Sequence, residues 1–453
     1  MIRVTFLPDG ERVRVEEGTT LREAAIKAGF LNCKGDNCNS CWSLFEIGGE
    51  YKPGCTFELR EDVIVNLNSR GENWKGENIS EVTKIALDIG TTTITAAFFD
   101  ESGEKIGSEV VINPQIAYGS DVVSRIEAIN RDANLLAKMR SKLLKEVNQL
   151  IEKRHLEKVE EIGIAGNPCM EHILLGVSPS GIGGYPYEPE FKNAAQMNAR
   201  EVGIDAGCEV FILPLISGWV GGDTVAMILS TGIHRSEEKV MGIDLGTNGE
   251  IVFGSKDGII TTSTAAGPAF EGVGITYGMP ATDGAIENVR INEKGEVRVK
   301  IKGGKKAKGI CGSGILDSIA EMLKREIMDT SGRMKWRAFH IHDGIYITQK
   351  DVRKVQLAKS AISTGVEMLK RELDLGAVKR TIVTGSFGNA SAESLSVIGI
   401  SGALFKKDAV IEGIKRALFG EKREAERIAR ESRWINLASH PSFSDGFMKN
   451  LGF

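Results

Sequence analysis

The chain has 453 residues, with 42% hydrophobic residues, 26% charged residues and a formal net charge of −4, which fits a globular protein of roughly two to four domains. Both signs of charge are mixed and no basic block occurs, so we expect no nucleic-acid partner and no electrostatic attachment to a membrane. The sequence has no signal-peptide core and no apolar run long enough to span a bilayer, which predicts a cytoplasmic protein.

Residues 1–67 are expected to form a first domain with the order strand, turn, strand, helix, cysteine loop and further strands. The segment RVTFLPDGERVRV predicts a hairpin, since two alternating runs flank PDGE. Thr19 or Thr20 is a candidate N-cap for the helix LREAAIKAGF, and Gly29 is a natural stop. The segments WSLFEIGGEYKPGC and DVIVNLN predict further strands.

Four of the seven cysteines lie in this first domain: Cys33, Cys38, Cys41 and Cys55. The spacing C-x4-C-x2-C followed by a later cysteine is the ligand spacing of plant-type ferredoxins, and the strand order is similar to theirs. We therefore predict a 2Fe–2S cluster. The alternative is a structural zinc site, but such sites usually pair two short cysteine knuckles, whereas the fourth cysteine here stands alone. The remaining cysteines are expected to be buried and unligated: Cys169, Cys208 and Cys311.

Residues 68–84, NSRGENWKGENISEVTK, are polar and lack clear periodicity, so we expect a linker with some mobility. Residues 85–453 would then form a second, larger domain. Its two subdomains are expected at about 85–238 and 239–453, because a hairpin pattern occurs near the start of each.

The repeated pattern is D-[IL]-G-T-[TN], found in IALDIGTTTITAAFFD and again in VMGIDLGTNGEIVFG. Each copy predicts two strands around a tight turn, and the repetition predicts two related subdomains. Glycine lets the backbone approach a phosphate closely, and successive turn amides form an anion cradle. The aspartates are placed to hold hydrated Mg²⁺ on a nucleotide. The residues concerned are Asp88, Gly90, Thr91 and Thr92 in the first copy, and Asp244, Gly246, Thr247 and Asn248 in the second.

The two hairpins resemble the phosphate-1 and phosphate-2 loops of the acetate and sugar kinase, heat-shock chaperone and actin superfamily. The resemblance implies an actin-like, ribonuclease H-like ATPase of the α/β class, behind an α+β, β-grasp ferredoxin-type domain. VTGSFGNASAESL matches the adenosine loop for ATP, through Gly385, Ser386 and Gly388. ICGSGILD places Gly312, Ser313 and Gly314 at a helix N-terminus, a further anion site.

The segment PLISGWVGGDTVAMIL occupies the place of the superfamily's first connecting helix. That helix often carries an acidic residue that positions the attacking water, and Asp223 is the candidate beside the catalytic carboxylates Asp88 and Asp244. Asp223 can equally be read as a helix N-cap. The role of Glu271 is ambiguous, and His172 is expected to be a packed or surface histidine.

A ferredoxin domain joined to such an ATPase resembles the reductive activators of corrinoid proteins, over nearly the whole chain. The segments that carry the resemblance occur in the family's order: ALDIGTTT, AGNPCMEHILLG, GIDLGTNGEIV, AAGPAFEG, KGICGSGILD and GSFGNA. The resemblance implies ATP-dependent reduction of a Co(II) corrinoid protein to Co(I) by one electron passed through the cluster. It also implies an electron donor not identified by any motif and a homodimer formed through the ATPase domain. Larger members place an extra middle domain after the ferredoxin, where this chain has a short linker.

Two other readings stay open. The first is an ATP-dependent activator of a radical dehydratase, but those carry a 4Fe–4S cluster shared across a dimer with two cysteines per chain. The second is a non-redox, zinc-stabilised kinase-like module, for which the sequence identifies no substrate base.

Overall fold

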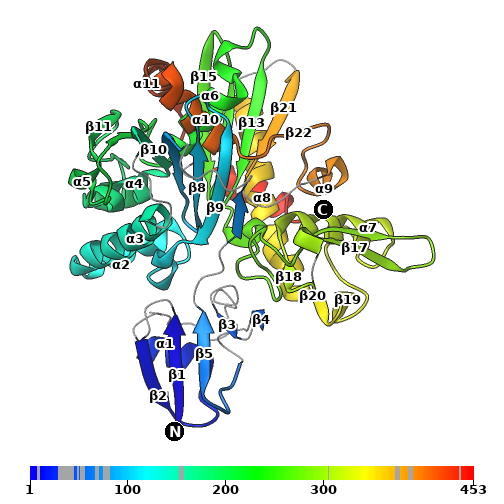
Figure 1. Ribbon diagram of the computed structural model, residues 1–453. Coiled ribbons are helices and arrows are strands. Elements are labelled where there is room, and N and C mark those ends of the chain that lie inside the picture. Colours follow the sequence, from blue (N-terminus) through cyan, green and yellow to red (C-terminus); the bar gives the residue numbers. More distant parts are fainter. Residues whose placement is uncertain are drawn as a thin grey trace.

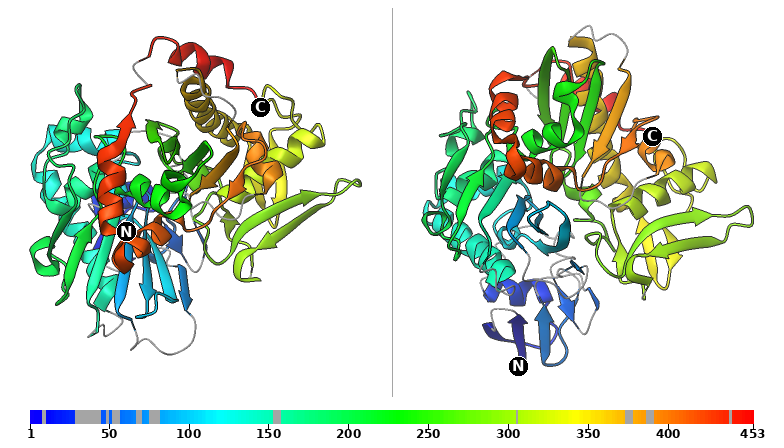
Figure 2. Two further views of the ribbon diagram at one scale, coloured as in Figure 1. Left: turned by 90° about the horizontal axis from the view of Figure 1, so that it is seen from above. Right: turned by 45° about the horizontal axis from the view of Figure 1, so that its top comes forward.

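The computed structural model describes residues 1–7, 11–28, 45–47, 50–51, 57–66, 71–74, 82–152, 158–304, 306–372, 378–385, 391–437 and 440–453. A small N-terminal unit lies beneath two larger halves, each built around its own sheet (Figure 1). Seen from above, the two halves stand side by side (Figure 2). Within the described ranges, no helix combines the length and apolarity that crossing a bilayer requires.

The N-terminal unit is a five-stranded sheet with one helix against it. The strand order is β2-β1-β5-β3-β4, with β1 parallel to β5 and antiparallel to β2. The predicted hairpin is confirmed, and Thr20 is the N-cap of α1, forming a capping box with Glu23. Gly29 and the four clustered cysteines lie outside the described residues. The elements are β1 (Ile2–Leu7), β2 (Glu11–Val15), α1 (Leu21–Lys27), β3 (Glu46–Ile47), β4 (Glu50–Tyr51) and β5 (Val63–Asn66).

The first large half contains a seven-stranded sheet of order β11-β12-β10-β7-β8-β9-β6. Its central strand β7 is buried between parallel β10 and antiparallel β8. The strands are β6 (Gly71–Trp74), β7 (Lys84–Ile89), β8 (Thr93–Phe99), β9 (Lys105–Ile112), β10 (Glu161–Gly166), β11 (Ala195–Asn198) and β12 (Glu209–Ile212). The helices are α2 (Val122–Arg131), α3 (Asn134–Glu152), α4 (Pro168–Leu175) and α5 (Ala199–Val202).

The second half repeats this arrangement in a six-stranded sheet of order β22-β21-β13-β14-β15-β23. Here β13 takes the place of β7, with parallel β21 on one side and the antiparallel pair β14 and β15 on the other. The predicted duplication of the hairpin is therefore a duplication of the sheet core. The strands are β13 (Val240–Leu245), β14 (Gly249–Ser255), β15 (Gly258–Thr264), β21 (Arg380–Thr384), β22 (Leu404–Phe405) and β23 (Ser432–Trp434).

Between β15 and β21 the chain forms an additional lobe of helices and short sheets, on the right of Figure 1. Its elements are β16 (Ala285–Ile291), β17 (Val297–Ile301), β18 (Gly309–Ile310), α7 (Gly312–Lys324), β19 (Ala338–His342), β20 (Ile345–Thr348) and α8 (Gln349–Glu372). The later helices are α9 (Ala392–Val397), α10 (Ala409–Arg416), α11 (Lys422–Glu431) and α12 (Phe443–Lys449).

Helices α6 (Gly222–Thr231) and α10 pack against each other between the two large sheets. One buried apolar cluster joins residues of both helices to Ala86 and Phe99 of the first sheet and to Val240 and Val252 of the second. The two halves are thus connected by a shared hydrophobic core as well as by the polypeptide segments that run between them.

Part of the segment expected to be an irregular linker is a strand. Residues Gly71–Trp74 form β6, which pairs antiparallel with β9 at the edge of the first sheet. Exposed strand edges accept further strands readily, because their backbone N–H and C=O groups are unpaired. Because β6 follows the N-terminal unit in the chain and pairs with β9, it attaches the chain after that unit to the first half.

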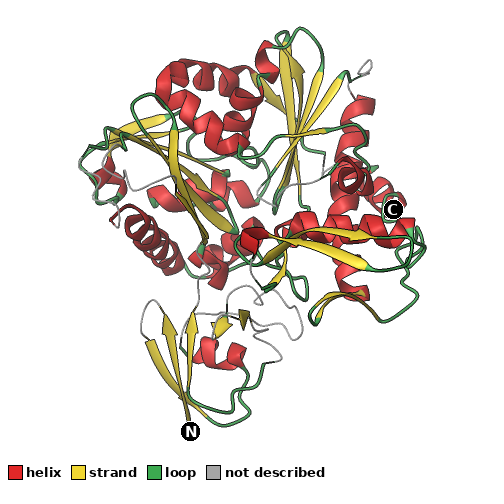
Figure 3. Ribbon diagram, turned by 45° about the vertical axis from the view of Figure 1, so that its right-hand side comes forward, coloured by secondary structure: helices red, strands yellow, loops and turns green. Residues whose placement is uncertain are grey.

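The N-terminal unit also packs on the seam between the two halves (Figure 3). Its buried cluster, which includes Val4 and Phe45, extends to Ile112 and Ile116 of the first half and to Val273 of the second. All these side chains are at most 8% exposed. The unit therefore contacts both halves at once.

Candidate functional site

The register of the two hairpins places Asp88 and Asp244 in matching positions. Asp88, near the end of β7, lies opposite Thr95 of β8, and Asp244, near the end of β13, lies opposite Glu250 of β14. In each case the strand is followed by a glycine turn. A Cβ on Gly90 would lie 2.8 Å from the carbonyl oxygen of Thr93, so the first turn closes this tightly only with glycine.

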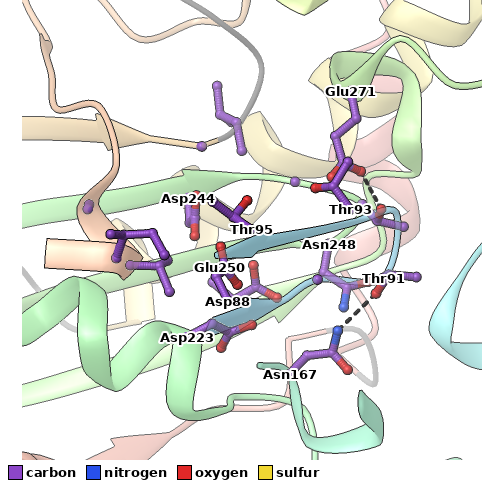
Figure 4. A pocket seen from close by; sticks show the side chains of 18 of the residues that line it. Asp88, Thr91, Thr93, Thr95, Asn167, Asp223, Asp244, Asn248, Glu250 and Glu271 are labelled. Atoms are coloured by element: carbon purple, nitrogen blue, oxygen red, sulfur yellow. Dashed lines mark hydrogen bonds between the residues drawn. The ribbon is translucent and has the colours of Figure 1, made fainter. Parts of the chain in front are cut away.

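These residues line one cavity of about 100 Å³ between the two halves (Figure 4). The structure brings both hairpins, the start of α6 and the end of β21 to this cavity. The predicted site residues among its lining are Asp88, Gly90, Thr91, Asp223, Asp244, Gly246, Thr247, Asn248 and Gly385.

Asp223 is not the N-cap of its helix, so that reading is wrong. The N-cap is Gly221, α6 begins at Gly222, and Asp223 lies in the first turn. Its Oδ1 accepts a hydrogen bond from the Thr224 amide at 2.6 Å. A Cβ at Gly221 would stand 2.3 Å from the Gly166 carbonyl oxygen, so glycine there lets the helix start directly beside the end of β10.

The cavity concentrates acidic groups that are short of compensating charge. Burial, followed by the neighbouring carboxylates, raises the pKa of Asp88 and Glu250 well above their usual values. Burial and the charge of Asp244 raise the pKa of Asp223 to about 7, and burial raises the pKa of Asp244. Such a cluster of repelling carboxylates is a favourable place for a divalent cation.

Asp88, Asp223 and Asp244 fit Mg²⁺ in donor chemistry, because Mg²⁺ takes oxygen ligands. In the part of the chain that the structure describes, no three acidic, histidine or cysteine side chains already surround a single metal position. Mg²⁺ commonly binds through one or two carboxylates and completes its shell with water and nucleotide phosphates. The arrangement therefore suits a cation that arrives with a phosphate ligand.

Hydrogen bonds fix the two hairpins in relation to each other. The Asn167 side chain, which caps α4, donates from Nδ2 to Thr91 Oγ1 at 2.9 Å. Glu271 ends the short 3₁₀ helix η6 (Pro268–Glu271), and its Oε2 accepts from Thr92 Oγ1 at 2.9 Å and from Thr247 Oγ1. Thr92 thus contacts Thr247 of the opposite hairpin and Glu271, whereas the neighbouring Thr91 contacts Asn167.

Sequence reasoning missed several residues that line the cavity. Asn167 lies in GNPCMEH, where Asn-Pro indicates a helix start but gives no sign of a phosphate site. The predicted second hairpin is a signal that could have identified Glu250, because this residue lies opposite Asp244 in that hairpin. Asp408 lies just before α10 and reaches the cavity through tertiary folding alone.

Other predicted residues fall elsewhere. Gly312, Ser313 and Gly314 begin α7 as predicted, but they are buried against β16, where Ser313 donates to the Glu287 carbonyl oxygen at 2.8 Å. They do not occur among the described residues that line the cavity, and their contact with nucleotide stays a prediction. Ser386 and Gly388 lie outside the described residues, as do Cys33, Cys38, Cys41 and Cys55.

Two expectations about residues outside the site are confirmed. His172 is a packed histidine, fully buried, with Nδ1 2.7 Å from the Pro168 carbonyl oxygen and Nε2 accepting from the Glu190 amide. The three remaining cysteines are buried free thiols: Cys169, Cys208 and Cys311.

A pair of duplicated sheets, two glycine–threonine hairpins and an acidic cavity between them define a two-subdomain ATPase fold of the acetate and sugar kinase, heat-shock chaperone and actin superfamily. Comparison with protein families agrees. The model of the C-terminal domain of RACo, its ASKHA domain, matches residues 238–453, and the model of the RACo middle region matches residues 83–236. This middle region is therefore present here, as the first of the two halves.

Individual relatives point the same way. The corrinoid activation enzyme RamQ of Eubacterium limosum is 32% identical over 424 residues, covering 82% of this chain and 70% of that protein. The [Co(II) methylated amine-specific corrinoid protein] reductase of Methanosarcina barkeri is 27% identical over 61% of this chain and 57% of its own length. A solved structure of a reductive activator for corrinoid, iron-sulfur protein superposes with a TM-score of 0.78 at 26% identity, covering 100% of this chain and 98% of that one.

The chain belongs to the family of reductive activators of corrinoid proteins. The predicted family is thereby confirmed.

Proposed function

We propose that this protein binds and hydrolyses ATP in the cavity between its two halves, and that it uses ATP to drive one-electron reduction of a partner's Co(II) corrinoid to Co(I). The observation that carries the proposal is the meeting of Asp88, Asp223 and Asp244 with both phosphate hairpins in one cavity. Membership of a family of corrinoid activators supports the substrate class.

In the ATPase reaction, the hairpin amides and the Thr91 hydroxyl would cradle the phosphates. Asp88 and Asp244 would hold Mg²⁺, which neutralises phosphate charge when it is bound. Asp223 is suited to orient the attacking water and accept its proton, because a base works best when its pKa lies near the operating pH. The Thr224 amide fixes the Asp223 carboxylate in place.

For the redox half-reaction we propose that Cys33, Cys38, Cys41 and Cys55 hold a 2Fe–2S cluster, which supplies one electron per turnover when it is bound. The mixed sheet of the N-terminal unit, with α1 against it, supports a β-grasp ferredoxin-type assignment for this unit. An electron-donor protein would be oxidised by one electron and the partner's Co(II) reduced to Co(I). A homodimer formed through the ATPase halves and a location in the cytoplasm complete the proposal.

ATP can assist such a reduction only through a difference in affinity between two states, because a ligand that binds both states equally shifts no equilibrium. Closure of the two halves around nucleotide is the natural movement in this fold. The N-terminal unit contacts both halves. Closure of the halves would therefore change the surface on which this unit packs.

The test combines two spectra on anaerobically purified protein. Electron paramagnetic resonance after dithionite reduction should show a 2Fe–2S signal, and absorbance of an added Co(II) corrinoid protein should report ATP-dependent formation of Co(I). Cys38→Ala should lose both signals and keep ATP binding. Asp88→Ala and Asp244→Ala should keep the cluster signal and lose ATP turnover. A silent sample that contains zinc without iron would favour the kinase-like module instead.

A further inference from the structure

Arg125 on α2 is a fully buried cation directly behind the first phosphate hairpin. Its Nη2 donates to the Thr91 carbonyl oxygen at 2.5 Å, and its Nε donates to the Gly119 carbonyl oxygen at 3.0 Å. Nη1 contacts Gln115 Oε1 and Met170 Sδ, both at 3.0 Å. Every one of these acceptors is uncharged, so among the residues that the structure describes the guanidinium has hydrogen-bond partners but no anion in contact.

The groups nearest to Arg125 do not supply that anion. Asp121 is occupied as the N-cap of α2, and Glu271 is held by the two hairpin threonines. Neither forms a direct hydrogen bond with Arg125 among the described residues, and both act on its charge only from a distance, raising the pKa of Arg125. The thiol of Cys169 is neutral, because burial raises its pKa to about 12. Burial lowers the pKa of Arg125 itself only to about 10, so it stays charged at neutral pH.

A buried charge without an anion in direct contact is costly, which makes a bound anion near Arg125 favourable. The anion has an obvious place on the cavity side of the hairpin. Carbonyl and N–H point in opposite directions across a trans peptide, so a Thr91 carbonyl held by Arg125 turns the Thr92 N–H away from the guanidinium. The Thr91 hydroxyl accepts from Asn167, which leaves its own hydrogen available to an anion.

We propose that Arg125 is a positioning residue for the phosphates of the nucleotide: its charge and its bond to the Thr91 carbonyl prepare the first hairpin for a polyphosphate without touching it. This rests on the proposed nucleotide function. In the low-dielectric interior, the charge of Arg125 acts on a bound anion across one peptide unit. Its contribution to affinity should therefore grow with the number of phosphates on the ligand.

The experiment measures binding of MgATP and of adenosine to the full chain by isothermal titration calorimetry. Arg125→Met should weaken MgATP about ten- to a hundredfold, the range expected for loss of one charged hydrogen-bonding group, and leave adenosine within twofold. Arg125→Lys keeps the charge and should hold the MgATP-to-adenosine affinity ratio within threefold of the wild type. The matched control is Arg140→Met, because Arg140 also donates to two backbone carbonyls, of Leu174 and Val202, and should change neither affinity.

If R125M binds MgATP and adenosine equally more weakly, Arg125 has a structural role and the proposal is overturned. The proposal is also overturned if R125M binds both ligands as the wild type does. If R125M does not fold, R125K decides alone: a tenfold loss of the ratio despite the retained charge would overturn the inference. Failure of the wild type to bind MgATP would count against the nucleotide function itself, whereas binding by the wild type and by R125M alike would count against Arg125 only.

Discussion

The side-chain hydroxyls of Thr92 and Thr247, one from each phosphate hairpin, lie 2.9 Å apart, and the same Glu271 oxygen accepts from both. Burial raises the pKa of the Glu271 carboxyl. The two halves are thus joined at their phosphate hairpins by a ring of close polar contacts among three side chains.

Glu271→Ala should open this ring. Two buried hydroxyls would lose a partner, so we expect the free energy of unfolding to fall by about 1–3 kcal/mol. Glu271→Gln should recover more than half of the loss, because its side-chain oxygen can still accept from the two hydroxyls and its NH₂ group can donate. Urea unfolding measures both, with the exposed Glu393→Ala as a control. Equal losses in the alanine and glutamine variants would show that the ring does not stabilise the structure.

The pKa of Asp223 predicts a pH dependence of stability. A carboxyl whose pKa is raised by folding favours the fold while it is protonated, so its contribution is complete below about pH 4 and is lost as the pH rises through about 7. Without nucleotide or Mg²⁺, the wild type should therefore lose stability relative to Asp223→Asn between pH 5 and pH 8, by a few kcal/mol in order of magnitude. The charges facing Asp223 have the same sign: Asp88, Glu171, Asp244 and Glu250.

Urea unfolding at pH 5 and pH 8 tests this prediction. Asp329→Asn is the control, because hydrogen bonds from Ser331 and Arg333 lower the pKa of Asp329 and its proton is already lost at pH 5. That variant should follow the wild type at both pH values. Parallel pH profiles for the wild type and D223N would contradict the role of buried charge at Asp223.

Val273 predicts how the N-terminal unit is held. This side chain is 2% exposed and joins the buried cluster of the N-terminal unit, only two residues after Glu271. Val273→Asp places a charge in that contact, so the unit should detach and the radius of gyration measured by X-ray scattering should increase. Hydrolysis of MgATP should stay within about threefold, because the cavity residues are unchanged.

The control for this prediction is Val123→Asp, since Val123 of α2 is 47% exposed and its replacement should leave the scattering unchanged. A compact V273D protein would show that other contacts hold the unit. If reduction of the corrinoid partner changes while MgATP hydrolysis does not, the docked arrangement itself affects electron delivery.

The repeated hairpin could be predicted from sequence because its signal is local: Asp88 and Asp244 are each followed by a glycine turn between β-branched strands. The cap at Thr20 was local as well. Glu250 and Asn167 were missed because their neighbours in the sequence resemble an ordinary strand and helix start. Glu250 lies opposite Asp244 across the local hairpin, whereas the pairing of the distant strands β10 and β7 brings Asn167 to the cavity. Nothing in the sequence around Arg125 marks it as buried, and its burial follows from the tertiary packing behind Thr91.

The crossing of α6 and α10 gives the last prediction. A Cβ on Gly413 of α10 would lie 1.9 Å from the carbonyl oxygen of Ala226 on α6, so the helices pack this closely only because Gly413 has no side chain. Gly413→Ala must push the helices apart, and we expect a loss of about 1–3 kcal/mol or more in the free energy of unfolding. Ala226 is one helical turn beyond Asp223, so the same displacement moves Asp223 at the cavity.

Turnover of MgATP by G413A should fall by tenfold or more, because misplacing a catalytic group by about 1 Å can cost a hundredfold in rate. Gly207→Ala is the matched control: a Cβ there meets no atom within 4 Å, so its stability should change by less than about 0.5 kcal/mol and its turnover should not change. Thermal unfolding and phosphate release measure the two effects. A G413A protein that is destabilised yet hydrolyses MgATP at the wild-type rate would separate the helix crossing from the position of Asp223, and would mean that the carboxylate is held by its Thr224 contact alone.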